Sequence, residues 1–265
     1  MRLKISHTTR YRYEEPVHSV LQQLRVTPKS RAGQNVLSWR TTVEGGKSQL
    51  QYDDHHNNHV ELVSFDDGRT EITVHCEGEV ETTNGSGIIG SHGGFAPLWL
   101  FRRATELTRI GPNVRKLART IAASDDQVAR LHDLSAAIIE AVPWEVGNTH
   151  PRTTAEEALD HDGGVCQDHA HVFVAAARAL GFPARYVSGY LMMDDRVEQD
   201  ASHAWAEAHV EGLGWVGFDV SNGISPDERY VRVATGLDYL EAAPVSGLRR
   251  GAGAENMMVS LQVQQ

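Results

Sequence analysis

The first third of the chain alternates apolar and polar residues, which is the pattern of half-buried β-strands. The alternation runs over residues 2–83 and is interrupted by turn formers such as residues 66–68 (Asp-Asp-Gly). Strands separated by such turns favour an antiparallel sheet. Ile72, Val74 and Cys76 fall on one face of the last strand, so we expect Cys76 to fill the core of this sheet.

Residues 84–94 (NGSGIIGSHGG) are rich in glycine and contain no Asp, Glu, Lys or Arg. This composition is typical of a flexible boundary between folded units. We therefore predict an N-terminal β-sandwich-like domain over residues 1–88 and a second domain over residues 89–265.

The second domain combines helical and strand patterns, which predicts an α+β fold. Apolar residues recur three or four positions apart, and two overlapping capping boxes lie at residues 153–157. These features predict helices over residues 95–101, 114–123, 128–142, 153–160 and 166–180. Strand patterns follow at residues 184–191, 204–210, 215–220 and 257–263, and a glycine-containing turn joins the middle two as a hairpin.

The charge of the chain excludes several classes of partner. It has 25 basic against 35 acidic residues, a formal net charge of −10, which repels nucleic acid and anionic membrane surfaces. No apolar run is long enough to span a membrane, and residues 1–16 lack the apolar stretch of a signal peptide. With only two cysteines, a disulfide framework is excluded, and we expect a cytoplasmic protein.

Cys166 has the sequence context of a reactive thiol. It follows Gly163 and Gly164 and begins a predicted helix, where unpaired amides and the helix dipole favour a thiolate. A catalytic thiolate also needs a histidine that moves the proton and a carboxylate that orients the ring.

The histidine partner is selected by secondary structure, because 14 histidines make nearness in sequence uninformative. His169 lies one turn along the same helix, where it is poorly placed to protonate a leaving group. His203 opens a predicted strand that the hairpin connects to Asp219. Cys166, His203 and Asp219 therefore form a predicted catalytic triad.

Several motifs resemble those of bacterial transglutaminase-like proteins, in the papain-like cysteine acyltransferase and protease superfamily. Residues 164–168 (GVCQD), 200–205 (DASHAW) and 214–219 (GWVGFD) resemble the family's cysteine, histidine and aspartate segments. Residues 11–13 (YRY) and 25–28 (RVTP) resemble its β-rich N-terminal region, so the resemblance covers nearly the whole chain. The sequence departs from the usual pattern at three places: His169 replaces an aromatic residue, Val220-Ser221 replace Pro-Thr, and residues 236–239 lack an arginine.

The resemblance implies attack on a peptide or glutamine amide through a thioester, without a metal or other cofactor. Water would release the product in a protease or amidase, and an amine would release it in a transglutaminase, a choice that the sequence leaves open. Gln167 and Trp144 are candidate substrate-binding residues. Asp168 and His171 are expected to cap and pack the cysteine helix, and Trp205 and Trp215 to lie in the core.

Two non-catalytic functions compete with this interpretation. In the first, Cys166, Asp168, His169 and His171 bind a metal, although helical geometry directs these side chains apart. In the second, the two domains form a peptide-binding groove and the triad is unused. The histidines of residues 53–59 (DDHHNNH) are expected in a solvated loop, because adjacent side chains at a turn do not define a metal geometry.

Overall fold

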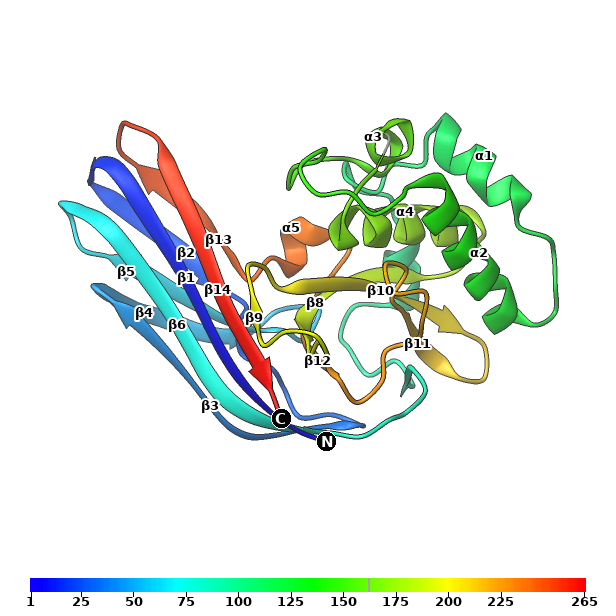
Figure 1. Cartoon of the computed structure of the whole chain (residues 1–265), viewed down its shortest axis with the longest axis horizontal. Helices are drawn as coiled ribbons and strands as arrows, with labels where there is room; N and C mark the ends of the chain where they lie inside the picture. Colours follow the sequence, from blue (N-terminus) through cyan, green and yellow to red (C-terminus); the bar gives the residue numbers. More distant parts are fainter. Residues whose placement is uncertain (162) are drawn as a thin grey trace.

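The computed structural model describes residues 1–161 and 163–265, and it places a β-rich region beside an α+β region (Figure 1). Two antiparallel sheets make up the β-rich region. The first has the strand order β3 (Gln34–Glu44), β6 (Arg69–Thr82), β1 (Arg2–Val17), β14 (Glu255–Gln264) and β9 (Glu198–Gln199). The second has the order β13 (Val245–Arg250), β2 (Ser19–Leu24), β5 (His59–Phe65) and β4 (Gly46–Asp53).

Alternate residues of β1 and β6 fill the core of the β-rich region. Odd-numbered residues of β1 from Leu3 to Tyr13 point inward, as the alternating pattern predicts. Cys76 in β6 is 1% exposed and packs with Ile72 and Val74, which confirms its predicted core position. Burial raises the pKa of the Cys76 thiol to about 12, so this cysteine is unreactive.

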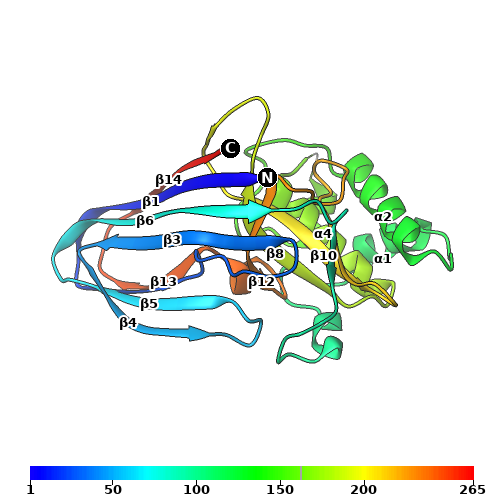
Figure 2. The same cartoon turned by 90° about the horizontal axis from the view of Figure 1, so that it is seen from below.

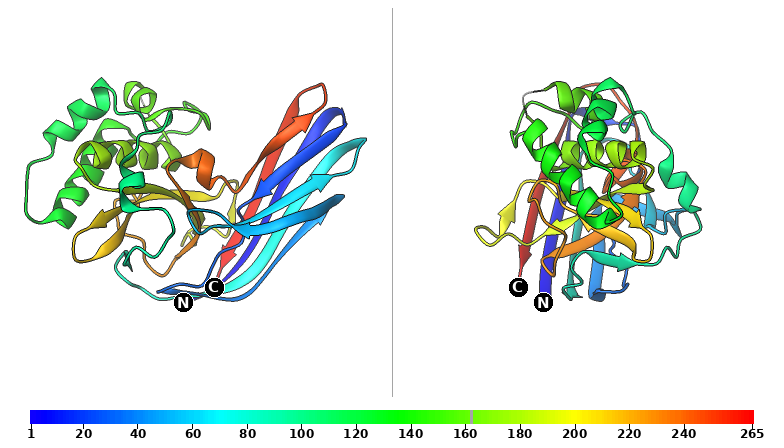
Figure 3. Two further views of the ribbon diagram at one scale, coloured as in Figure 1. Left: turned by 180° about the vertical axis from the view of Figure 1, so that it is seen from behind. Right: turned by 90° about the vertical axis from the view of Figure 1, so that its right-hand side faces the viewer.

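The α+β region is a third antiparallel sheet with helices packed on it (Figure 3). Its strand order is β12 (Tyr230–Gly236), β8 (Ala184–Leu191), β10 (His203–Val210), β11 (Gly214–Phe218) and β7 (Ile88–Gly90). The helices are α1 (Pro112–Thr120), α2 (Gln127–Ala141), α3 (Ala155–Asp160), α4 (Cys166–Ala179) and the short α5 (Tyr239–Ala242). This architecture confirms the predicted α+β class. No helix of the described residues has both the length and the apolar character needed to cross a membrane.

Helix α4 lies at the centre of this region. It is covered by α1, α2 and α3 on one side and by β8 and β10 on the other. Its residues from Val172 to Ala177 are completely buried in a core shared with α2 and β11. The predicted apolar stripe therefore understates the burial of α4, since nearly all of its surface contacts other elements.

The glycine-rich segment differs from the predicted flexible boundary. Residues 88–90 form β7, which extends the third sheet by pairing with β11. A side chain on Gly214 would place its Cβ 2.1 Å from the carbonyl oxygen of Gly90, so glycine permits the close approach. The predicted helix over residues 95–101 is a 3₁₀ turn at Leu98–Arg102.

The end of the chain returns to the β-rich region (Figure 2). β13 pairs with β2, and β14 pairs with β1 over ten residue pairs from Lys4–Gln264 to Tyr13–Glu255. The predicted division at residues 88 and 89 assigns both strands to the second domain, whereas their hydrogen bonds join them to the first two sheets. The alternating pattern of residues 257–263 predicts a strand, but it carries no information on a partner more than 240 residues away.

Candidate active site

Cys166 is the first residue of α4, and a carboxylate fixes the backbone beside it. Asp168 accepts hydrogen bonds from the backbone N–H of Val165 at 2.9 Å and from the hydroxyl of Thr149 at 2.7 Å. Gly164 permits this contact, because an added Cβ would lie 3.0 Å from the Cβ of Asp168. The predicted capping role of Asp168 agrees with these bonds, and the Cys166 side chain remains partly exposed.

His203 and Asp219 meet at one end of the β10–β11 hairpin. Nε2 of His203 lies 2.6 Å from Oδ2 of Asp219. In the hairpin, Ala206 is opposite Phe218, and one further step along this register places Asp219 opposite Trp205. His203 lies two residues from Trp205 and therefore on the same face, which brings its ring to the carboxylate.

Asp219 is completely buried and its charge is held by several donors. Asn222 donates from Nδ2 at 2.7 Å, and the hydroxyl of Tyr230 donates at 2.7 Å. Burial alone would favour the neutral acid, but the bonds from His203, Asn222 and Tyr230, together with the charge of His203, keep the pKa of Asp219 below its usual value. The carboxylate therefore remains ionised.

The surroundings of His203 favour its protonated form. Burial opposes the charge, but hydrogen bonds to Asp219 and Cys166 and the negative charges of both groups raise the pKa of His203 to about 10. Asp219 occupies Nε2, which leaves Nδ1 for Cys166. A protonated ring between a carboxylate and a thiol can deliver a proton to a leaving group.

Cys166 and His203 line one cleft of about 240 Å³ between the two regions. Gln167, Tyr186 and Tyr239 line it from the α+β region. β1 and β14 form the opposite wall, with side chains that alternate along the strands. The residues of this wall are His7, Thr9 and Tyr11 of β1 and Met257 and Val259 of β14.

Two polar residues on the wall interrupt an otherwise apolar face of β1. Nε2 of His7 lies 3.1 Å from the hydroxyl of Thr9, and Nδ1 lies 2.9 Å from the hydroxyl of Tyr190. Burial, with a smaller effect of His75, lowers the pKa of His7 to about 4, so the ring is neutral. The sequence analysis missed these residues, although two polar residues at inward positions between Ile5 and Tyr11 are the signal that could have revealed them.

The two candidate substrate-binding residues differ in position. Gln167 lines the cleft and donates a hydrogen bond to the carbonyl of Pro151 at 3.2 Å. Trp144 is 55% exposed and its ring lies 6.1 Å from that of His169, outside the cleft wall. Trp205 and Trp215 are almost completely buried, which confirms their predicted core positions.

The histidines of α4 bind separate partners rather than a common centre. Nε2 of His169 lies 2.7 Å from the carbonyl oxygen of Val142, and its Nδ1 lies 2.8 Å from the hydroxyl of Ser221. His171 accepts the backbone N–H of Tyr239 at 3.1 Å. These contacts favour packing roles for both rings and do not support the alternative metal cluster on this helix.

A cysteine at the start of a buried helix, with a histidine and an aspartate on a neighbouring hairpin, defines a papain-like α+β protein. Residues 115–220 match the family model of the transglutaminase-like superfamily, and residues 3–81 match the bacterial transglutaminase-like N-terminal region. Together the two matches confirm the resemblance to transglutaminase-like proteins that the motifs predicted.

Similar proteins include mycobacterial chains of uncharacterised function. The chain is 29% identical to one from Mycobacterium leprae, with 99% of this chain and 98% of the other aligned. It is 28% identical to a protein-glutamine gamma-glutamyltransferase of Pseudomonas aeruginosa over 52% of this chain and 23% of that protein. A solved structure from Cytophaga hutchinsonii, provisionally described as a cysteine protease, has a TM-score of 0.77 and 21% identity and covers all of this chain and 91% of the other. This last similarity shows the shared fold.

Proposed function

We propose that this chain is an enzyme that uses Cys166 to cleave or transfer peptide or glutamine amides through a thioester. The observation that carries this proposal is the position of His203, which contacts Asp219 through Nε2 and shares a cleft with Cys166. His203 and Asp219 form a buried, charged pair beside a partly exposed thiol. Packing alone does not explain such a pair, so it supports a function in acyl transfer.

In the first step, the thiolate of Cys166 attacks the carbonyl carbon, and the carbonyl oxygen becomes an oxyanion near the start of α4. The backbone N–H of Cys166 is the proposed donor to this oxyanion, and one such donor contributes about 2.7–4 kcal/mol. His203 then gives its proton to the leaving nitrogen as the C–N bond breaks. Proton transfer of this kind contributes roughly 10²–10⁴ in rate.

In the second step, water or a primary amine attacks the thioester and gives its proton to His203. The C–S bond breaks, and the Cys166 thiolate and the protonated His203 are restored. Throughout both steps, Asp219 orients the ring of His203. These steps use only residues of the chain and the substrate, so the proposal includes no cofactor.

The shape of the cleft supports a protein or peptide substrate. Its wall on β1 and β14 presents Tyr11, Met257 and Val259, which suit an apolar side chain near the reactive amide. The neutral pair of His7 and Thr9 suits an uncharged hydrogen-bonding group. We include Gln167 among the substrate-binding residues because it borders the same cleft.

Transfer of a glutamine acyl group to an amine has support from the comparison with the Pseudomonas aeruginosa enzyme, whose name describes this reaction. Hydrolysis uses the same first step and differs only in the second nucleophile. We retain both reactions in the proposal. We also propose that the protein is cytoplasmic.

Incubation of the protein with a glutamine-containing peptide, with and without a primary amine, tests the proposal by mass spectrometry. Addition of the amine with loss of ammonia indicates transfer, conversion of the amide to the acid indicates deamidation, and shortened peptides indicate proteolysis. Cys166→Ala must abolish the product. Equal product from Cys166→Ala would contradict the proposal, and binding of the peptide without any product would favour a peptide-binding protein.

A further inference from the structure

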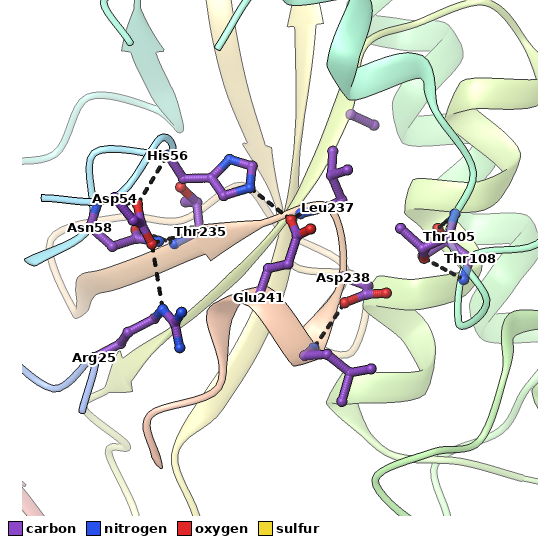
Figure 4. A network of polar contacts seen from close by, with 12 residues as sticks. Arg25, Asp54, His56, Asn58, Thr105, Thr108, Thr235, Leu237, Asp238 and Glu241 are labelled. Atoms are coloured by element: carbon purple, nitrogen blue, oxygen red, sulfur yellow. Dashed lines mark hydrogen bonds and ion pairs between the residues drawn. The ribbon is translucent and has the colours of Figure 1, made fainter. Parts of the chain in front are cut away.

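The loop between β4 and β5 is firmly docked on β12 and α5 (Figure 4). Asp54 accepts the backbone N–H groups of His56 and Asn58, each at 2.9 Å. The side chain of Asn58 pairs with the backbone of Thr235, donating to its carbonyl at 2.7 Å and accepting from its N–H at 2.8 Å. These bonds give the loop a defined geometry, which the sequence analysis did not expect.

The docked loop places His56 against Glu241 of α5, as Figure 4 shows. Nε2 of His56 lies 2.7 Å from Oε2 of Glu241, and the His56 side chain is 1% exposed. Within the described residues, Nδ1 of His56 is buried and has no hydrogen-bond partner. If the His56 ring binds a metal, it therefore loses only its hydrogen bond with Glu241.

Glu241 is oriented for an interaction with cationic groups. It accepts the backbone N–H of Leu237 at 2.8 Å, which fixes the carboxylate. A backbone-anchored carboxylate is a suitable metal ligand.

His55 is the third member of a cluster with His56 and Glu241. Its ring centroid lies 4.0 Å from that of His56, and one ligand atom each of His55, His56 and Glu241 lies within 4.8 Å of the others. We propose that these three residues bind a divalent transition-metal ion such as zinc. Two imidazole nitrogens and one carboxylate oxygen are a favourable donor set for zinc, and solvent supplies the fourth position.

The proposed metal site links two segments that are far apart in the sequence. It joins a loop of the β-rich region to α5, and α5 begins with Tyr239, which lines the cleft beside Cys166. A bound ion would hold the two regions together at one border of the cleft. His55 and the partly exposed Glu241 lie at the surface, so the ion can enter from solvent.

The test uses the full chain in a Cys166→Ala background, because a thiolate beside His203 could itself bind zinc. After treatment with a chelator, zinc is added in a calorimetric titration. We expect one zinc per chain, with the dissociation constant raised about tenfold or more by His55→Ala and by Glu241→Gln. His59→Ala is the matched control, since His59 is a histidine of the same segment that lies outside the group, and it should bind like the parent.

Thermal unfolding gives a second measurement. Zinc should raise the unfolding temperature of the parent and of His59→Ala but not that of His55→Ala. His55 is exposed, so His55→Ala should fold even if Glu241→Gln does not. Absence of stoichiometric binding by the parent, or unchanged affinity in His55→Ala, would overturn the proposal and leave a simple ion pair between His56 and Glu241.

Discussion

Tyr230 donates its hydroxyl to the same Oδ2 atom of Asp219 that lies 2.6 Å from His203. The two contacts come from different strands, since Tyr230 begins β12 and His203 begins β10. Tyr230 therefore holds the same carboxylate oxygen that the imidazole contacts. Its presence makes the position of His203 dependent on three strands rather than on the hairpin alone.

Replacement of Asp219 by asparagine tests the role of the negative charge that contacts His203. Burial lowers the pKa of His203, but hydrogen bonds and charges of Asp219 and Cys166 together raise it to about 10; Asp219→Asn removes one of these charges, so this pKa should fall. We expect amide turnover to fall by roughly 10⁴-fold, as in other histidine–carboxylate pairs. Turnover and an NMR titration of the His203 ring measure both effects. Asp195→Asn, at an exposed position, is the control, and equal loss in both variants would contradict the assignment.

Replacement of Tyr230 by phenylalanine tests the second support of Asp219. Tyr230→Phe removes one hydrogen bond to a buried carboxylate, which should lower the free energy of unfolding by about 1.5–3 kcal/mol. Turnover should fall less than in Asp219→Asn, because the charge remains. Urea denaturation and turnover provide the two readouts, with Tyr52→Phe on the exposed strand β4 as the control. Unchanged stability would show that the hydroxyl contributes nothing to the native state.

Selective alkylation tests the different environments of the two cysteines. Iodoacetamide should label Cys166 in the folded chain and leave Cys76 unlabelled, because Cys76 is 1% exposed and its pKa is raised to about 12. His203→Ala should slow the labelling of Cys166, since the thiolate loses a cationic neighbour. Peptide mapping after timed labelling measures each site. Faster labelling of Cys76 than of Cys166 would reverse the assignment of the reactive thiol.

His7 predicts a loss of stability in acid. Its pKa is about 4 in the folded chain against an ordinary value of 6.5, so the unfolded chain binds the proton more readily between these values. The free energy of unfolding should therefore fall by about 3 kcal/mol from His7 alone as the pH drops from 6.5 to 4.

His7→Gln tests this pH dependence. The variant should lose stability at neutral pH, because Thr9 and Tyr190 lose a partner, but its stability should change less between pH 6.5 and 4. Urea denaturation at several pH values measures the slope. His18→Gln, at an exposed position, should retain the parent slope, and an identical slope in His7→Gln would contradict the prediction.

The wall on β14 predicts a specificity effect. Met257→Ala should raise KM for a glutamine peptide several-fold, because the side chain borders the cleft but does not take part in the chemical steps. Alkylation of Cys166 by iodoacetamide should remain unchanged, which separates substrate contact from damage to the thiol. Leu248→Ala on the exposed face of β13 is the control. Equal KM in both variants would exclude Met257 from substrate recognition.

The sequence predicted the parts of the site that depend on local pattern. The glycines before Cys166 and the apolar stripe after it mark the start of α4, and the hairpin signal brings His203 and Asp219 to one end of two adjacent strands. Periodicity and turn residues act over a few positions, so they determine such elements well.

The other contacts around the site depend on segments that are far apart in the sequence. Tyr230 reaches Asp219 because β12 pairs with β8, which in turn pairs with β10, and Glu241 meets His56 across 185 residues. His7 enters the cleft because the β-rich region packs against the α+β region. No local pattern encodes these pairings, so the nearness of His203 and Asp219 was predictable from the sequence, whereas the contacts of Tyr230, Glu241 and His7 were not.

The pairing of β14 with β1 brings residues from opposite parts of the sequence to one wall of the cleft. β14 follows every other described element along the chain, and it contributes Met257 and Val259 to the wall opposite Cys166. Truncation before β14 would keep Cys166, His203 and Asp219 in the chain but would remove Met257 and Val259 from the cleft. Contact with a substrate would then be weakened while the reactive groups remain.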